Sequence, residues 1–89
     1  MKIKNAVALI TGSSSGIGAA TARLFAEQGC HVVINYSRNE DGARAVAKEC
    51  QAFGVRTLVH QADVADDAQC RALVKATVDE FGRLDVLIN

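Results

Sequence analysis

The sequence has no proline and no tryptophan, and its aromatic residues are limited to three phenylalanines and one tyrosine. Without proline it contains neither a proline-rich linker nor a collagen-like repeat. It also lacks a hydrophobic run near the ~20 residues that a membrane-spanning helix needs. The longest run near the start of the chain, residues 6–10, has five residues, and after Met1–Lys4 this is too short for a secretory signal. The sequence therefore predicts a globular protein with no membrane partner.

The sequence also has no net charge, because ten lysines and arginines balance ten aspartates and glutamates. No overall field directs the chain toward nucleic acid, so we expect no nucleic-acid partner. The charges are unevenly distributed, since residues 1–38 hold four basic groups and one acidic group. This excess favours an anionic ligand in the first part of the chain.

Cysteine and histidine are scarce. The three cysteines stand twenty residues apart, without any Cys-x-x-Cys pair. An odd number of cysteines in unrelated contexts predicts free thiols in a reducing compartment, so we expect a cytoplasmic protein. His31 and His60 lie in strand-like runs without the spacing of metal ligands, and no metal site is expected.

The apolar residues follow two alternating periods along the chain. Residues 6–11 form a continuous apolar run, typical of a strand buried on both faces, residues 31–35 form a β-branched run, and residues 55–62 and 84–89 are also expected to be strands. Between them, apolar residues recur at helical spacing in three segments that end at Gly29, Gly54 and Gly82. Asp66 and Gln69 resemble a capping box at the start of the third helix. This βαβαβαβ alternation predicts an α/β fold, a doubly wound parallel sheet in one domain over residues 1–89.

The turn between the first strand and the first helix, residues 11–18, reads T-G-S-S-S-G-I-G. A phosphate group at this turn would meet free backbone N–H groups and the positive end of the helix dipole. A P-loop is excluded, because Ile17 stands where that motif requires lysine. Residues 12–16 also satisfy G-x-S-x-G, which would make Ser14 the nucleophile of a serine hydrolase with Asp41 and His60 as partners. The expected position of His60 inside a strand disfavours this alternative.

The spacing G-x-x-x-G-x-G resembles the T-G-x-x-x-G-x-G turn of the short-chain dehydrogenase/reductase family. Asp63-Val64, at the end of the third strand, resembles the clamp that holds the adenine ring in this family. Residues 84–89, L-D-V-L-I-N, resemble the strand that leads into its N-N-A-G motif. The resemblance covers the whole chain and is closest in wording to bacterial 3-oxoacyl-acyl-carrier-protein reductases.

This resemblance implies a Rossmann-type sheet with strand order 3-2-1-4, two helices on one face and the third on the other. Asp63 would accept a hydrogen bond from the exocyclic amine of adenine, and the N–H of Val64 would donate to the ring. The alternative for Asp63 is a turn residue ahead of the third helix. The remaining residues implied in cofactor binding at the turn and at the chain end are Gly12, Ser14, Ser15, Gly16, Ile17, Gly18 and Asn89.

The end of the second strand bears on the choice of cofactor. An acid at this place binds the ribose 2′-hydroxyl of NAD, but here no acid occurs until Glu40. A carboxylate would repel the 2′-phosphate of NADP, whereas Arg38 can pair with it. We therefore expect NADP(H) in preference to NAD(H), bound at its adenine ribose by Tyr36, Ser37 and Arg38. Ser15 departs from the basic residue that many NADP-preferring relatives carry before the second glycine.

The catalytic residues of the family are absent from the sequence. The resemblance implies a catalytic tyrosine with a lysine four residues later, but Tyr36 is the only tyrosine and is followed by Glu40. We expect these 89 residues to be the N-terminal, cofactor-binding part of a longer reductase, inactive alone. That reductase would move hydride between NADP(H) and a carbonyl/alcohol pair, and would form a homo-oligomer, a tetramer or a dimer. The alternative is a non-catalytic module that binds the dinucleotide.

Overall fold

The computed structural model describes residues 3–89, in which strands and helices alternate as predicted. The strands are β1 (Val7–Ile10), β2 (His31–Tyr36), β3 (Thr57–Gln61) and β4 (Val86–Ile88). The helices are α1 (Gly16–Glu27), α2 (Glu40–Gln51) and α3 (Asp67–Phe81). β1, β3 and β4 are a few residues shorter than the segments predicted to be strands.

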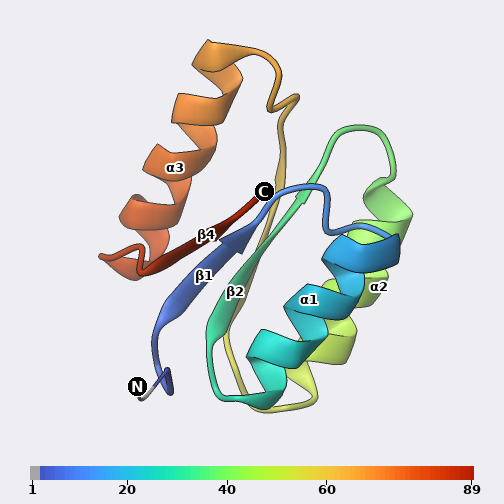
Figure 1. Ribbon diagram of the computed structural model, residues 1–89, viewed down its shortest axis with the longest axis vertical. Coiled ribbons are helices and arrows are strands. Elements are labelled where there is room, and N and C mark those ends of the chain that lie inside the picture. Colours follow the sequence, from blue (N-terminus) through green and yellow to red (C-terminus); the bar gives the residue numbers. More distant parts are fainter. Residues whose placement is uncertain (1–2) are drawn as a thin grey trace.

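The four strands form one parallel sheet in the order β3-β2-β1-β4, which confirms the expected order. β1 lies between β2 and β4, with Ile10 paired to Ile34 on one side and to Ile88 on the other. β2 pairs with β3 through Ile34 and Val59. Because all strands run in the same direction, the turns that follow them lie at one edge of the sheet (Figure 1).

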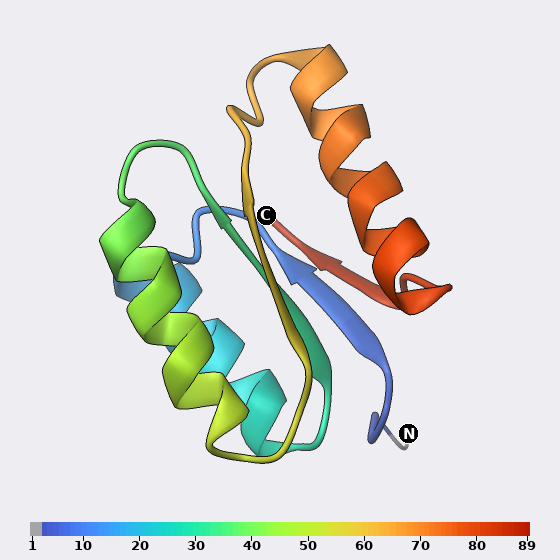
Figure 2. The same ribbon diagram turned by 180° about the vertical axis from the view of Figure 1, so that it is seen from behind.

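Helices cover both faces of the sheet, as expected, with α1 and α2 on one face and α3 on the other (Figures 1 and 2). Alternate residues of β1 and β2 point to opposite faces. Ala8 and Ile34 pack in the cluster under α1 and α2, whereas Leu9 and Val33 pack in the smaller cluster under α3. Burial on both faces explains why these strands are continuous apolar runs.

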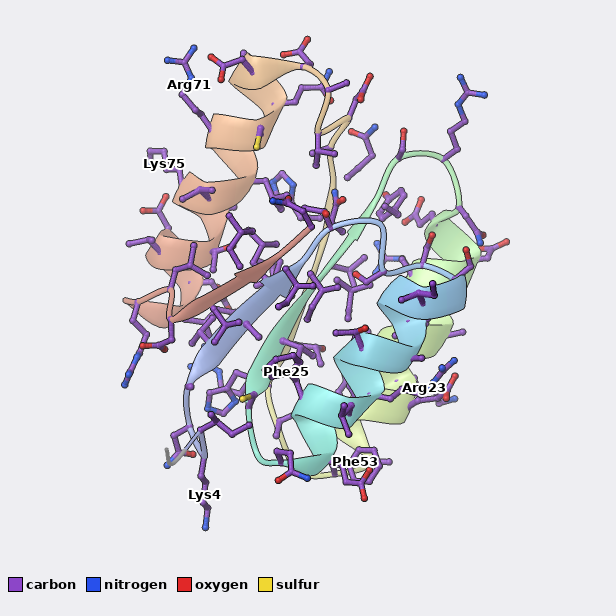
Figure 3. The ribbon with its side chains drawn as sticks, viewed as in Figure 1. Lys4, Arg23, Phe25, Phe53, Arg71 and Lys75 are labelled. Atoms are coloured by element: carbon purple, nitrogen blue, oxygen red, sulfur yellow. The ribbon has the colours of Figure 1, made fainter. Side chains whose placement is uncertain are left out.

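The two helices on the first face pack closely because the fully buried residues of α1 are all small, while Phe25 packs against the same core at its margin. The buried residues of α1 are Ala19, Ala22 and Ala26. An ion pair between Arg23 Nε and Glu49 Oε2, 2.6 Å apart, joins α1 to α2 at the surface (Figure 3). On the other face, Arg71 and Lys75 project from α3 away from the sheet (Figure 3).

The start of α3 differs in one detail from the predicted capping box. Asp66 caps the helix as expected, since its Oδ1 accepts from the N–H of Gln69 at 3.1 Å. The Gln69 side chain does not return to Asp66, however, but accepts from the N–H of Asp63 at 2.8 Å. The reason is that the N–H of Asp66 already donates to the carbonyl oxygen of Asp63 at 3.0 Å. Within the described part of the chain, no helix has the length and apolar character needed to cross a bilayer.

Candidate functional site

The turn between β1 and α1 leaves a row of backbone donors free. Ser15 occupies the N-cap position of α1 but forms no side-chain cap, and the first turn contains no acid. Within residues 3–89, the N–H groups of residues 14–18 have no hydrogen-bond acceptor. α2 and α3, in contrast, are capped by Asn39 and Asp66 and carry acids in their first turns. The N-terminus of α1 is therefore the one suited to an anion, because free donors and the helix dipole both favour negative charge there.

The three glycines of this turn are each required by its shape. Gly12 and Gly16 both have a φ of 58°, in the left-handed region that other residues seldom adopt. Gly18 packs so closely under the turn that a Cβ at this position would collide with the carbonyl oxygen of Gly12. The glycine spacing of the turn thus reflects left-handed backbone conformations at Gly12 and Gly16 and a close contact at Gly18.

Ser13 and Asn35, to which the sequence assigned no role, hold the turn against the end of β2. Ser13 Oγ donates to the carbonyl oxygen of Ile10 at 2.7 Å and accepts from the N–H of Asn35 at 2.9 Å. The N–H of Ser13 donates to the carbonyl oxygen of Asn35 at 2.9 Å, and the N–H of Gly12 donates to Asn35 Oδ1 at 3.1 Å. In the sequence, this role is indicated by one feature, the polar residue Asn35 at the end of a run of apolar strand residues.

Asp63 acts as a turn residue and also keeps one carboxylate oxygen free. Its Oδ1 accepts from the N–H of Ala65 at 3.0 Å, which fixes the side chain. Within residues 3–89, neither Asp63 Oδ2 nor the N–H of Val64 has a hydrogen-bond partner. The two interpretations of Asp63 are therefore compatible, because the turn uses one oxygen and leaves the other exposed beside a free donor.

The segment after β2 carries an unpaired cation. Tyr36 ends the strand, and the carbonyl oxygen of Ser37 accepts from Gln61 Nε2 at 3.2 Å. Arg38 is exposed and forms no ion pair in the described part of the chain. The nearest acid, Glu40, is instead engaged by Arg44, whose Nη2 lies 2.7 Å from Glu40 Oε2. The guanidinium of Arg38 is thus available to an anionic ligand.

Two further predicted residues lie at the same edge of the sheet. Asn89 directly follows β4, and its Oδ1 lies 3.5 Å from Thr11 Oγ1 at the start of the glycine turn. Ile17, in the first turn of α1, has an apolar side chain that is 88% exposed. An apolar side chain at the surface of a turn with free donors favours contact with a ligand that is partly apolar.

The hydrolase alternative finds no support in this arrangement. Ser14 has a negative φ, unlike the strained nucleophile of a G-x-S-x-G elbow. Within residues 3–89, no hydrogen bond joins Ser14 to His60 or Asp41, and the buried Nδ1 of His60 has no partner. Nor does that part of the chain contain a cluster of three His, Cys, Asp or Glu residues that could hold a metal ion.

Relatives of this chain in sequence and in fold include oxidoreductases. Residues 6–89 match the family described as short chain dehydrogenase. An uncharacterized oxidoreductase from Methylorubrum extorquens is 48% identical over 88 residues, which are 99% of this chain and 36% of that protein. A 3-oxoacyl-acyl-carrier-protein reductase from Staphylococcus aureus is 45% identical over 82 residues, 92% of this chain and 33% of the reductase.

Solved structures agree with these sequence relatives. A short chain dehydrogenase from Burkholderia cenocepacia, in complex with NADP, superposes with a TM-score of 0.95 at 39% identity. The match covers 100% of this chain and 36% of that one. The chain thus spans about a third of the length of the relatives it matches. On the match of residues 6–89, it belongs to the short chain dehydrogenase family.

Proposed function

We propose that the chain is the cofactor-binding part of an NADP(H)-dependent oxidoreductase acting on a carbonyl/alcohol pair. The observation that carries this proposal is the uncapped N-terminus of α1, where the N–H groups of residues 14–18 have no acceptor within residues 3–89. These donors fit a diphosphate, which needs several N–H groups and gains from the helix dipole. The free Asp63 Oδ2 and Val64 N–H fit an adenine ring, which has one donor and one acceptor on the same edge.

Each part of the dinucleotide has its own set of residues. The diphosphate is held by the turn and the first residues of α1, namely Gly12, Ser14, Ser15, Gly16, Ile17 and Gly18. Asp63 and Val64 bind adenine, and Asn89 lies toward the nicotinamide half. A bound nicotinamide supplies or accepts the hydride. The residues of this chain bind and orient the cofactor, and the exposed side chain of Ile17 covers its apolar surface.

The preference for NADP(H) rests on the segment after β2. Arg38 is exposed and unpaired within residues 3–89, while Glu40 is engaged by Arg44. A guanidinium can bind a 2′-phosphate through two parallel hydrogen bonds, and Ser37 can donate a third. With Tyr36 these residues form the site of the adenine ribose phosphate.

The proposal extends to the substrate, the assembly and the location of the complete protein. The Staphylococcus aureus relative is named for reduction of 3-oxoacyl groups, so a carbonyl compound of that type is the first substrate class to test. The complete protein forms a homo-oligomer, a dimer or a tetramer. All three cysteines are free, which is consistent with a reducing cytoplasm.

A second candidate function, a module that binds the dinucleotide without catalysis, is favoured by one observation. Tyr36 is the only tyrosine of the 89 residues, and the fourth residue after it is Glu40, so these residues contain no Tyr-x-x-x-Lys pair. The two candidates make the same prediction for cofactor binding and differ in turnover.

Fluorescence titration of the full-length protein with NADPH and with NADH tests the proposal. We expect NADPH to bind more tightly than NADH. Equal affinities, or tighter binding of NADH, would contradict the NADP(H) preference, and binding of neither would contradict the function itself. Oxidation of NADPH in the presence of a 3-oxoacyl thioester distinguishes the enzyme from the non-catalytic module.

A further inference from the structure

Asn35 is a buried polar side chain at the end of an otherwise apolar strand. It is 2% exposed, and the three residues before it in β2 are buried and apolar. Burial of an amide costs free energy unless its polar atoms form hydrogen bonds. Because burying the Asn35 amide costs free energy, we expect its hydrogen bonds to have a specific structural role.

Both ends of the Asn35 amide are bonded. Oδ1 accepts from the N–H of Gly12 at 3.1 Å. Nδ2 lies 3.2 Å from the carbonyl oxygen of Ala62 and 3.3 Å from that of His60. These partners define the orientation of the amide, because a flipped amide would place its NH₂ against an N–H and its oxygen against carbonyl oxygens.

The partners of Asn35 belong to two separate parts of the proposed cofactor site. Gly12 opens the turn assigned to the diphosphate, and Ala62 directly precedes Asp63, which is assigned to adenine. β2 lies between β1 and β3 in the sheet, so a side chain at its carboxyl end reaches the turns that follow both neighbours. Asn35 is thus a hydrogen-bonded bridge between the glycine turn and the Asp63 turn.

We infer that Asn35 is a positioning residue that sets the distance between the diphosphate and adenine subsites. This inference rests on the proposed function, since it assumes a ligand that occupies both subsites. A ligand that spans them is sensitive to their relative placement, whereas a ligand confined to one subsite is not. Comparing the affinities for the two kinds of ligand therefore distinguishes a positioning role of Asn35 from a general effect on folding.

Asn35→Asp is the most informative variant. It keeps the acceptor for the N–H of Gly12 but replaces Nδ2 with an oxygen that faces the carbonyl oxygens of Ala62 and His60. The glycine turn then stays attached, while the Asp63 turn loses its side-chain hydrogen bond from Asn35 and keeps the backbone bond from the N–H of Ala62 to the carbonyl oxygen of Tyr36 at 2.9 Å. Val33→Ala is the matched control, because Val33 is buried on the same strand and packs in the same apolar cluster as Ala62, but its side chain forms no hydrogen bond.

The experiment measures dissociation constants in the full-length protein for NADPH and for adenosine 2′-monophosphate, which lacks the diphosphate. For Asn35→Asp we expect the constant for NADPH to rise about tenfold or more, the scale of a lost buried hydrogen bond. The constant for adenosine 2′-monophosphate should change less than about threefold, and Val33→Ala should leave both within about threefold. In an Asp63→Ala background, Asn35→Asp should add little further loss, because NADPH that no longer binds through Asp63 is no longer sensitive to the placement of the adenine subsite.

Equal losses for the two ligands, or a loss of NADPH affinity in Val33→Ala as large as in Asn35→Asp, would overturn the inference. Additive losses in the Asp63→Ala background would also do so. If Asn35→Asp does not fold, Asn35→Ser replaces it, and two unfolded variants beside a folded Val33→Ala would make Asn35 purely structural. Failure of the unmodified protein to bind either dinucleotide is a different result, because it contradicts the proposed function and not the bridge.

Discussion

Gly42 of α2 lies directly against the carbonyl oxygen of Ser14 in the glycine turn. A Cβ at residue 42 would stand 2.7 Å from that oxygen and would overlap the side chain of Asn39, which caps α2. The first turn of α2 therefore supports the turn between β1 and α1 from the side. This contact joins residues that are 28 positions apart in the sequence.

Gly42→Ala should destabilise the protein, although alanine is the better helix former. Helix propensity alone predicts a gain of roughly 0.5–1 kcal/mol. We expect a loss of about 1–3 kcal/mol instead, because the added methyl group overlaps rigid neighbours. Urea unfolding measures the effect, and NADPH titration should show weaker binding as the glycine turn shifts. Ala45→Gly is the control variant, because residue 45 lies on the exposed side of α2 and measures the helix propensity of alanine against glycine without a collision. A Gly42→Ala variant more stable than the unmodified protein would show that the contact between Gly42 and Ser14 is loose.

Arg38→Ala should reduce the affinity for NADPH and leave that for NADH unchanged. Loss of a charge-assisted pair with the 2′-phosphate is worth about 1.5–3 kcal/mol, or roughly tenfold to a hundredfold in the dissociation constant. Arg71→Ala is the control, because Arg71 is an exposed arginine of α3 that projects away from the sheet and pairs with Asp67 at 2.8 Å. If Arg38→Ala lowered the affinities for NADPH and NADH equally, the result would show that Arg38 does not bind the 2′-phosphate.

The stability of the protein should fall in mild acid because of His31. Its Nδ1 accepts from the N–H of Arg56 at 2.9 Å, and its ring stacks on Phe81 with centroids 5.9 Å apart. Burial, and then the positive charge of Arg56, lower the pKa of His31 below its ordinary value of 6.5. The unfolded chain therefore binds a proton at a higher pH than the folded protein does. The stabilising contribution is complete above about pH 6.5 and is lost as the pH falls toward the lower pKa of the folded state.

Urea unfolding at pH 8 and at pH 5.5 measures this dependence. His31→Asn is the control variant, since an asparagine oxygen can accept from the N–H of Arg56 but does not titrate. We expect the free energy of unfolding to drop more between the two pH values in the unmodified protein than in His31→Asn. An equal drop would assign the pH dependence to groups other than His31.

Asp85→Ala should loosen β4 at its start. Asp85 Oδ2 accepts from the N–H of Val7 at 2.8 Å, and the N–H of Asp85 donates to the carbonyl oxygen of Val7 at 3.0 Å. The hydrogen bond from Arg83, and then that from Val7, lower the pKa of Asp85. Removal of the carboxylate leaves the buried N–H of Val7 without a partner, which is the costly outcome for a hydrogen bond.

Hydrogen exchange of the Val7 and Leu87 amides reports this loosening directly, and we expect faster exchange in Asp85→Ala. Asp79→Ala is the matched control, because Asp79 forms an exposed pair with Lys75 at 2.6 Å on α3 and supports no strand. If the two variants exchanged alike, the Asp85–Val7 hydrogen bond would have no role in holding β4.

The sequence alone determined the order of the elements, the parallel sheet and the place of the glycine turn. These features depend on local chemistry. An apolar run reports burial on both faces of a strand, and Gly12, Gly16 and Gly18 report backbone shapes that few other residues adopt. The predicted cap at Asp66 is likewise local, because the acceptor and the N–H it binds are three residues apart.

Only the tertiary structure decided which polar groups are used and which remain free. Gln69 bonds to the N–H of Asp63 because the N–H of Asp66 is already taken, and the N–H of Val64 between them has no partner within residues 3–89. Asn35 and Gly42 acquire their roles from segments 23 and 28 positions away, the turns at Gly12 and Ser14. Hydrogen bonds and close contacts between distant segments leave no periodic trace in a sequence. They exist only once the parallel strands bring the turns to one edge of the sheet.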